Sequence, residues 1–386
     1  MNPKQLLLFL ILATLLHGCS NETSQRSLSN HMYVWNQLWT DDVFDAFQQW
    51  KPQLAGFHVL AVTMDKHQRF KRIQLDPKAF TNLQETTFVI RINGHTLPST
   101  TSLLTEVAYL QTAGLIKQNS RIEIDYDAPT SQLGTYAAWL QDLKSSIEIP
   151  LGITAIPTWS NSKDLRKLLD QLDYYVLQVH SVLSPEKGLF DQELAVNWVK
   201  KFNQISDTSF LLSLPSYWYE GGFDRNNELQ FLQAEQSQFI SSDSSKEIYA
   251  DPKELAKTIT LIHALNIEHL TGIIWFRMPN ESDQRTFSSQ TLSHLMNGTY
   301  EWQDNLELHK VPISNTLSNY DLVLVNASEV DVVSQGNYSL TGCQQKHLID
   351  GVTAADSILN ITNKSVFRPG EKLRVGWGTC EGENSL

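Results

Sequence analysis

Between Met32 and about Asn297, eight short β-rich runs alternate with segments of helical length, and this alternation constrains the fold more than any other feature. The β-rich runs cover residues 33–39, 56–64, 87–93, 121–127, 151–157, 174–180, 210–217 and 272–278. Amphipathic segments lie between most of them, for example 102–113, 134–145, 163–172, 192–205 and 252–265. Strands that alternate with helices become parallel strands joined by crossovers. Eight such units in roughly 250 residues are what a closed (β/α)8 TIM barrel requires, so we predict one over residues 31–300.

The main alternative is a doubly wound open sheet. That fold would be expected to carry a glycine-rich phosphate-binding turn after its first strand. The segment 35–40 (WNQLWT) contains no glycine, which favours the barrel.

From Leu306 onward the pattern changes to short alternating runs with little helix between them. The runs cover residues 306–311, 321–326, 338–343, 357–361 and 373–377, and turn residues such as Pro369-Gly370 separate them. This pattern predicts a small antiparallel β-sandwich over residues 301–386. Cys343 and Cys380 fall in this region, and in an oxidising compartment such a pair predicts a disulfide. Zinc would need more ligands at short spacing than these two cysteines provide.

The N-terminus has the pattern of a bacterial lipoprotein signal peptide. Lys4 precedes an apolar run over residues 6–16, which is shorter than the roughly 20 residues that a membrane-spanning helix needs. Leu16, Gly18 and Cys19 fall at the lipobox positions. We therefore predict that residues 1–19 are a signal peptide and that the Cys19 sulfur carries a diacylglycerol. An ordinary signal peptide that contains a cysteine is the alternative.

Residues 20–30 (SNETSQRSLSN) are polar and predict a flexible stalk between the lipid and the fold. Because acyl chains hold a protein on a membrane through their buried CH₂ groups, the lipid would be a tether without a chemical role. Ser20 stands where an aspartate favours inner-membrane retention. We therefore expect a lipid-anchored protein of the bacterial cell envelope, at the outer membrane and facing the periplasm or the cell surface.

Charge and composition narrow the range of partners. The net charge is −12, the pI is near 5.4 and no cluster of lysine and arginine is present, which argues against nucleic acid as a partner. Ten tryptophans and twelve tyrosines suit the binding of sugar rings, and they suit an ordinary core as well. We expect a carbohydrate ligand, and contact with a membrane through the N-terminal lipid.

Polar side chains interrupt the predicted barrel strands near their C-terminal ends. Strands of a parallel barrel are normally apolar on both faces, but Arg91, Asn93 and His95 share one face of the third strand. On other strands, the same alternation predicts inward-facing side chains for Trp35, Gln178, His180, Tyr217, Trp275 and Arg277. Active sites of TIM barrels form at this end of the strands. We predict that Arg91, Asn93 and the residues of this second set bind substrate there.

The fourth strand carries the most specific signal, three carboxylates on one face: Glu123, Asp125 and Asp127. Like charges this close raise the pKa of at least one carboxyl group, and a carboxyl that stays protonated near neutral pH can act as a general acid. Cleavage of a glycosidic bond uses such an acid together with a second carboxylate. The alternative is a salt-bridge cluster neutralised by Arg91 and Arg277. We interpret Asp125 and Asp127 as catalytic and Glu123 as supporting.

Residues 120–127 (SRIEIDYD) resemble the fourth-strand signature of the chitinase-like glycosidases of family eighteen, in which apolar residues alternate with carboxylates. The resemblance implies that Asp127 is the catalytic acid and that Glu123 and Asp125 support it. It also implies that Trp275 corresponds to the tryptophan on the floor of that family's site. The sequence departs from the signature in two places, because the acid is an aspartate where the family has glutamate and Arg121 stands where the family has glycine.

A second resemblance covers nearly the whole chain after the signal peptide. The run 33–39 (YVWNQLW), the segment 124–129 (IDYDAP) and the β-rich C-terminal region are similar to those of a family of bacterial lipoproteins that is described as a domain of unknown function. That resemblance implies a glycosidase-like barrel and specifies no substrate.

A further carboxylate follows the seventh strand. Roughly 35 residues separate this strand from the helix at Pro252, and connections of such length are often functional. Glu220 lies near the start of this connection, where many barrel glycosidases have their nucleophile, and aromatic residues flank it. We predict Glu220 as a candidate catalytic partner. The alternation of the strand would turn Tyr217 and Tyr219 inward and Glu220 outward, so the alternative is a solvated loop glutamate.

The histidines give weaker signals. His180 would act as a general base or an orienting group, or would simply fill the rim of the barrel, and we interpret His58 as a core residue. The histidines show no metal-ligand spacing, and His95 with Asp125 and Asp127 is the one combination that suggests a metal cluster. We expect neither a metal ion nor another cofactor.

Three functions are compatible with these patterns. The first is a glycoside hydrolase that acts on a polysaccharide or oligosaccharide by carboxylate general acid catalysis. The second is a non-catalytic lipoprotein that binds a glycan or a protein on a TIM-barrel scaffold, and the two departures from the glycosidase signature favour it. The third is a metal-dependent hydrolase. The fold alone does not decide among them.

Overall fold

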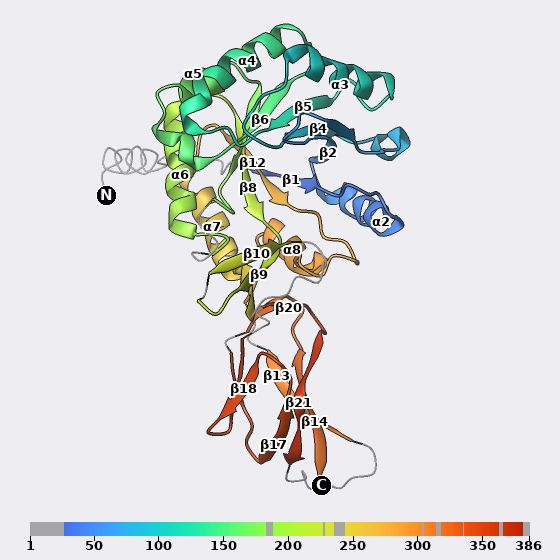
Figure 1. The fold of residues 1–386 in the computed structure, drawn as a ribbon, viewed down its shortest axis with the longest axis vertical. Helices are drawn as coiled ribbons and strands as arrows, with labels where there is room; N and C mark the ends of the chain where they lie inside the picture. Colours follow the sequence, from blue (N-terminus) through green and yellow to red (C-terminus); the bar gives the residue numbers. More distant parts are fainter. Residues whose placement is uncertain are drawn as a thin grey trace, which may run out of the picture.

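A computed structural model of the chain describes residues 27–182, 188–226, 228–234, 244–302, 305–313, 318–334, 336–362 and 366–380. It consists of a barrel surrounded by helices and a smaller β-rich domain at the C-terminus (Figure 1). The predicted signal peptide, Cys19 and residues 20–26 of the predicted stalk lie outside the described residues. Within the described part of the chain, no helix is both long enough and apolar enough to cross a membrane.

Eight parallel strands form the barrel. They are β1 (Ser29–Val34), β2 (Gly56–Met64), β4 (Glu85–Ile92), β5 (Ser120–Asp125), β6 (Leu151–Ala155), β7 (Tyr174–Gln178), β8 (Phe210–Pro215) and β12 (Leu270–Phe276). Their order around the barrel is β1-β12-β8-β7-β6-β5-β4-β2, and a parallel pairing between β1 and β2 closes the ring. The predicted (β/α)8 TIM barrel is therefore confirmed.

Helices lie on the outside of the strands (Figure 1). They are α2 (Asp41–Trp50), α3 (Thr100–Thr112), α4 (Leu133–Ser145), α5 (Leu165–Leu169), α6 (Gln192–Ile205), α7 (Pro252–Leu265) and α8 (Ser289–Met296). Helices α6 and α7 have the predicted bounds because an aspartate caps each N-terminus. The Asp191 side chain accepts a hydrogen bond from the Leu194 amide, and the Asp251 side chain accepts one from the Lys253 amide.

Side chains along each barrel strand alternate between the interior of the barrel and the surrounding helices. An interior apolar cluster consists of Tyr33, Val89, Tyr174, Val176, Leu211 and Ile274. The opposite faces of the same strands pack against the helices in a larger apolar core. This alternation decides which side chains can reach the mouth of the barrel.

The first strand begins earlier than its predicted start at residue 33, and the predicted end of the stalk at residue 30 is also wrong. Ser29 and Asn30 already pair with Gly272 and Ile273 of β12. The Ser29 hydroxyl donates a hydrogen bond to the carbonyl oxygen of Thr271 (3.1 Å). The close approach requires glycine at position 272, because a Cβ there would lie 2.4 Å from the Ser29 carbonyl oxygen. The strand therefore begins with the polar residues Ser29 and Asn30, and no apolar run in the sequence marks its start.

Four strands beside the barrel have no counterpart among the predicted elements. Strand β3 (Phe70–Arg72) runs antiparallel to β2. Strands β9 (Trp218–Phe223), β10 (Leu229–Gln233) and β11 (Ser244–Tyr249) form an antiparallel sheet in the order β10-β9-β11. The long connection after the seventh barrel strand is thus a small sheet over its described residues.

The C-terminal domain contains two main antiparallel sheets. The first consists of β13 (Leu306–Pro312), β14 (Asn319–Asn326), β21 (Lys372–Cys380) and β17 (Cys343–Leu348), in that order. The second consists of β16 (Asn337–Ser339), β19 (Ile358–Ile361) and β18 (Val352–Ala355), and a separate pairing joins β15 (Val332–Val333) to β20 (Val366–Phe367). Both main sheets contribute to one apolar core, for example through Leu324, Val375 and Leu359, as expected for a small β-sandwich.

One predicted strand of this domain, 338–343, is wrong. Strand β16 ends at Ser339 and β17 begins at Cys343. Gly342, at a φ of 73°, turns the chain between them, a conformation that glycine adopts without steric cost.

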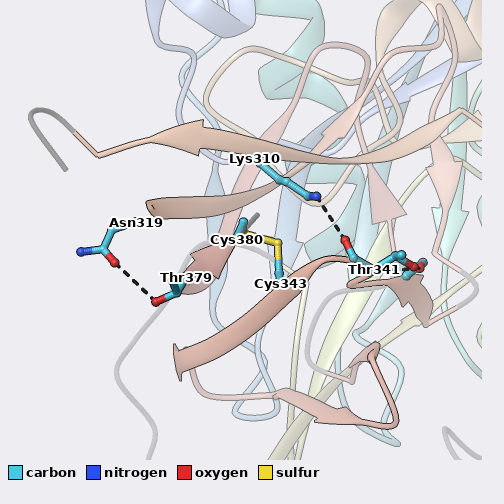
Figure 2. The surroundings of a disulfide bond; sticks show 7 residues. Lys310, Asn319, Thr341, Cys343, Thr379 and Cys380 are labelled. Atoms are coloured by element: carbon cyan, nitrogen blue, oxygen red, sulfur yellow. Dashed lines mark hydrogen bonds between the residues drawn. A yellow bond between two sulfur atoms is a disulfide. The ribbon is translucent and has the colours of Figure 1, made fainter. Parts of the chain in front are cut away.

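Cys343 and Cys380 form the predicted disulfide between β17 and β21 (Figure 2). The two residues lie directly opposite each other in the register of the two strands, with their Cα atoms 4.0 Å apart. Beside the bridge, the ammonium group of Lys310, in β13, donates a hydrogen bond to the Thr341 carbonyl oxygen (3.1 Å) (Figure 2). The disulfide therefore fixes the edge strand β17 to the strand that ends the domain.

Polar groups also connect the C-terminal domain to the barrel domain. The Asp331 carboxylate accepts a hydrogen bond from the amide of Ser288, the N-cap of α8 (2.8 Å). The Arg368 guanidinium donates to the carbonyl oxygen of Thr286 (3.1 Å from Nε). Both contacts involve the segment that follows the last barrel strand.

We predict that combining Cys343→Ser with Cys380→Ser lowers the free energy of unfolding of the C-terminal domain by about 4 kcal/mol, because the bridge spans a sequence separation of 37 residues. Hydrogen exchange in β17 and β21 reports this domain separately from the barrel strand β8. We expect faster exchange in the first two strands and unchanged exchange in β8. A reductant should reproduce the effect in the wild type, whereas equal exchange in variant and wild type would contradict the prediction.

Candidate functional site

A cavity of about 390 Å³ lies at the C-terminal ends of the barrel strands. This volume falls in the usual range of ligand-binding pockets, about 300–1,000 Å³. The predicted site residues that line it are Trp35, Arg91, Asn93, Asp125, Asp127, Gln178, His180 and Tyr217. The structure thus brings together, in one pocket, side chains from strands that are far apart in the sequence.

Arg91, Asp125 and Asp127 form an ion-paired cluster on one side of this pocket. Arg91 and Asp125 are neighbours in the register of β4 and β5. The Arg91 guanidinium donates from Nη1 to an Asp125 carboxylate oxygen and from Nη2 to an Asp127 carboxylate oxygen, each at 2.8 Å. The Asp125 side chain is 6% exposed and that of Asp127 is 48% exposed. Asp127 is therefore the carboxylate that a ligand in the pocket can reach.

The two carboxylates have different environments. Burial raises the pKa of Asp125 to about 6, the positive charge of Arg91 opposes this rise, and the negative charge of Asp127 adds to it. The Asp125 carboxyl group therefore gains and loses its proton near neutral pH. Arg91 bridges it to the carboxylate of Asp127. The predicted salt-bridge alternative applies here in part, because Arg91 binds both aspartates.

Glu123, two residues before Asp125, lies deeper in the barrel and is fully buried. Its carboxylate accepts hydrogen bonds from the Tyr33 hydroxyl (2.6 Å) and the Thr154 hydroxyl (3.1 Å), and it lies 2.7 Å from His58 Nδ1. Neither Arg91 nor Arg277 is its partner in these bonds, in contrast to the predicted salt-bridge alternative. Glu123 does not line the pocket. It is placed to support the strands that carry the pocket residues.

His180 lines the pocket from the end of β7. Its Nε2 lies 3.0 Å from the Ser213 hydroxyl. Its backbone carbonyl accepts a hydrogen bond from the side-chain amide of Gln178 (3.1 Å). Burial lowers the pKa of His180 to about 3. The imidazole is therefore neutral at pH 7 and too weak a base to serve as the predicted general base, and its geometry suits an orienting group.

Aromatic rings form the opposite side of the pocket. Phe276 lies at the centre of this group, with ring centroids 5.1 Å from Trp35 and 5.3 Å from Tyr217. The Tyr219 hydroxyl lies 2.8 Å from the Tyr217 hydroxyl and 2.9 Å from the Ser181 hydroxyl. Such a wall presents apolar faces and hydroxyl groups together, a combination typical of pockets for polar organic ligands.

The predicted positions of Trp275 and Arg277 in the pocket are wrong. Ile274 and Phe276 face the interior of the barrel, so the residues that alternate with them face the helices. Trp275 is fully buried in the outer core, where its indole NH donates to the side chain of Asn30 (3.2 Å). Arg277 forms an ion pair with Asp283. The implied floor tryptophan is accordingly replaced by Phe276.

The predicted catalytic role of Glu220 is also wrong on geometric grounds. Glu220 lies in β9, opposite Glu247 of β11, and its carboxylate forms an ion pair with Arg285. It does not line the pocket, whereas Tyr219 beside it does. The alternation that turns Tyr217 and Tyr219 inward continues past the end of β8, and this places Glu220 on the other face.

His95, Asp125 and Asp127, the one combination in the sequence that suggested a metal cluster, do not come together. His95 is exposed and does not line the pocket. Among the described residues, the one group of histidines, cysteines and carboxylates whose ligand atoms lie close enough to share an ion consists of His31, His58 and Glu85. These residues lie near the other end of the barrel strands.

Several pocket residues were not among the predicted site residues. Tyr219 follows from the alternation that turns Tyr217 inward, so a signal for it exists in the sequence, whereas Phe276 lies in an apolar run that gives no such signal. Ser181 has a φ of 56°, and nothing in the sequence marks it as a pocket residue. The remaining lining residues are Gln37, Leu60 and Thr63.

Solved structures with a similar fold include two enzymes of low sequence identity. The spore cortex-lytic enzyme SleL from Bacillus megaterium QM B1551 gives a TM-score of 0.52 at 12% identity, over 72% of this chain and 75% of that chain. A chitinase from Chromobacterium violaceum ATCC 12472 gives a TM-score of 0.50 at 11% identity, over 71% of this chain and 99% of that chain. At such identities the similarity establishes the fold alone.

A comparison with curated proteins yields no match. Residues 85–281 match the family described as "Domain of unknown function (DUF3142)". The matched segment contains most of the pocket residues, including Arg91, Asp125, Asp127 and Tyr217. Because the match covers slightly more than half of the chain, this chain belongs to the DUF3142 family.

Proposed function

We propose that this chain is a glycoside hydrolase that binds one end of an oligosaccharide or polysaccharide in the barrel pocket. The observation that carries the proposal is the composition of the pocket wall, in which the ion-paired Asp125 and Asp127 face a group of aromatic rings. Aromatic faces and hydroxyl groups suit a sugar ring, and a carboxyl group that is exposed in the pocket suits proton transfer to a bound ligand. The shared fold with a chitinase and a cortex-lytic enzyme agrees with this proposal.

Asp127 is the proposed general acid. Its carboxylate is half exposed in the pocket and can contact the oxygen of a glycosidic bond. Asp125 is buried beside it, and burial raises the pKa of Asp125 to about 6. Arg91 binds both carboxylates and holds them next to each other. Arg91 positions Asp127 through this ion pair, which would open when the Asp127 carboxyl takes up its proton and form again once the proton passes to the glycosidic oxygen.

The described residues that line the pocket do not supply a second carboxylate on the far side of the sugar. Asp125 and Asp127, the carboxylates among them, are two residues apart in the sequence, and both bind Arg91. One class of glycosidases without such a carboxylate uses a group of the substrate in its place. We therefore propose a substrate whose sugar carries an N-acetyl group next to the bond that is cleaved. Chitin-like and peptidoglycan-like polymers contain such sugars.

A non-catalytic glycan-binding protein is the second candidate function. It is favoured by the contacts of Arg91, because the guanidinium occupies an oxygen of each carboxylate in the pocket. The acid position holds an aspartate, one methylene shorter than the glutamate of the resembled signature. In this case the same pocket would hold the sugar without cleaving it.

We further propose that a lipid on Cys19 holds the protein on the bacterial envelope, with the predicted outer-membrane location. A protein tethered in this way meets glycans of the envelope or of the surroundings. The proposal depends on the lipobox pattern of residues 16–19 alone.

For the hydrolase proposal, we predict that Asp127→Asn lowers turnover of N-acetylated oligosaccharides at least 100-fold and preserves binding, because the amide cannot donate a carboxyl proton. Turnover is measured with the purified protein on labelled chito-oligosaccharides and on cello-oligosaccharides, which lack the acetamido group. Isothermal titration calorimetry measures binding separately. Glu220→Gln serves as the matched control, since Glu220 lies outside the pocket, and should retain activity.

The outcomes of this experiment separate the two candidate functions. Binding of a glycan by the wild type without turnover would favour the binding protein over the hydrolase. Cleavage of cello-oligosaccharides at a similar rate would contradict the role of the acetamido group. Absence of both binding and turnover on all glycans would contradict both functions.

We also predict that Arg91→Met raises the pKa of Asp125 further above about 6, because it removes the positive charge that opposes the effect of burial. An NMR titration of the labelled aspartate carboxyl carbons measures this change. Arg69→Met, at an exposed position, should leave the Asp125 titration unchanged. A lower Asp125 pKa in Arg91→Met would show that Arg91 does not stabilise the charged form.

For the anchor, we predict that Cys19→Ser abolishes incorporation of a labelled fatty acid in a bacterial host and moves the protein out of the membrane fraction. Cys343→Ser is the matched control and should remain labelled. Undiminished labelling of the Cys19→Ser protein would exclude this cysteine as the lipidation site.

A further inference from the structure

We propose that His31, His58 and Glu85 bind a divalent transition-metal ion, best matched by Zn²⁺, near the N-terminal end of the barrel. The proposal is independent of the pocket and of its function. The three residues come from three strands, and the metal would join these strands inside the barrel.

The strand register brings the three residues together. His31 of β1 pairs with Gly56 of β2, and Gly56 pairs in turn with Glu85 of β4. His58 lies two residues beyond Gly56 and therefore on the same face of β2. His31 and His58 are 6% and 0% exposed, and the Glu85 side chain is 18% exposed. The cluster is thus largely shielded from solvent and reachable only on the Glu85 side.

The distances fit a shared ion. One potential ligand atom from each of the three residues lies within 4.8 Å of the other two. His31 Nδ1 lies 3.9 Å from a Glu85 carboxylate oxygen, Oε1. Two ligands of tetrahedral zinc, each about 2.1 Å from the ion, lie about 3.4 Å apart. The His31–Glu85 distance exceeds this value slightly, so metal binding requires the three side chains to move closer together.

Each of the three residues has a buried atom without a hydrogen-bond partner among the described residues. These atoms are Nδ1 of His31, Nε2 of His58 and Oε1 of Glu85. A buried polar atom left without a partner costs about 1–3 kcal/mol. Three such atoms in one cluster would be costly, and a cation satisfies all of them because each can present a lone pair.

The other polar atom of each side chain is already held. His31 Nε2 lies 3.0 Å from the Ser29 hydroxyl, and His58 Nδ1 lies 2.7 Å from the Glu123 carboxylate. The second Glu85 oxygen binds the Arg121 guanidinium at 2.6 Å. Metal-binding histidines characteristically use their second nitrogen for a bond to a carboxylate or another polar group, which fixes the ring for coordination.

Glycine at position 56 leaves space beside the cluster. A Cβ at this position would lie 3.0 Å from His31 Nδ1 and 3.1 Å from the Glu85 Cβ. A larger residue would therefore crowd the atoms that we assign as ligands.

The donor set identifies the class of ion. Two imidazoles and one carboxylate are ligands of Zn²⁺ in proteins, and they also suit Fe²⁺. Calcium and magnesium prefer oxygen ligands and do not fit this set. We choose Zn²⁺ because it favours tetrahedral sites and does not change its oxidation state. Co²⁺ serves as its spectroscopic substitute.

The test uses the full chain, unfolded with a chelator present and refolded with or without Zn²⁺ or Co²⁺. We expect one metal ion per folded chain by elemental analysis, a higher melting temperature with metal, and visible absorption of Co²⁺ typical of tetrahedral coordination. We expect His31→Leu and Glu85→Gln to lower the apparent affinity at least 10-fold. His95→Leu is the matched control, because His95 is exposed and distant from the cluster in the strand register, and should bind as the wild type does.

Two results would overturn the proposal. One is a folded wild-type chain that binds neither Zn²⁺ nor Co²⁺ stoichiometrically, which would leave a polar cluster bridged by solvent only. The other is undiminished binding in both His31→Leu and Glu85→Gln. If His31→Leu fails to fold, the Glu85→Gln protein and the titration of the wild type still decide the question.

Discussion

The carboxylate of Glu123 lies fully buried inside the barrel and bonds to side chains from three other strands, Tyr33 of β1, His58 of β2 and Thr154 of β6. A buried charge is tolerated only when its hydrogen bonds are complete, so these strands must keep one relative position. β1 and β2 are the pair that closes the ring. Asp125 lies on the same face of the same strand, two residues closer to the pocket. The position of the pocket carboxylates therefore depends on the bonds of Glu123.

The sequence allowed the barrel and most of its elements to be predicted, because apolar runs and amphipathic helices alternate with regular spacing. The faces of the last barrel strand could not be predicted in the same way. Residues 273–276 are all apolar, so no pattern of polar residues tells which of them face the interior. A shift of one residue exchanges the two faces of a strand, and Trp275 was thereby assigned the position that Phe276 occupies. On β5, by contrast, carboxylates alternate with isoleucines, and the face of Asp125 was evident.

Contacts between neighbouring barrel strands could be predicted only where both residues lay within predicted strands, and His31 and Glu85 lie before the predicted starts of their strands at residues 33 and 87. The bond between Arg91 and Asp125 could be proposed, because their strands are consecutive in the barrel prediction. The cluster of His31, His58 and Glu85 has no local spacing that resembles a metal motif. It arises only when three strands adopt a specific register. Residues that act together in a barrel interior are therefore harder to find from sequence than residues at the strand ends.

The contact between Arg368 and Thr286 links the C-terminal domain to the pocket through a single backbone segment. Thr286 forms an isolated bridge with Tyr217, and the amides of Trp218 and Phe287 donate across the same pair of segments. Arg368 holds the carbonyl group of Thr286 from the other side. The C-terminal domain thus contacts the segment that pairs with the aromatic wall of the pocket. A truncated chain without the sandwich would retain every pocket side chain and lose part of the frame that positions them.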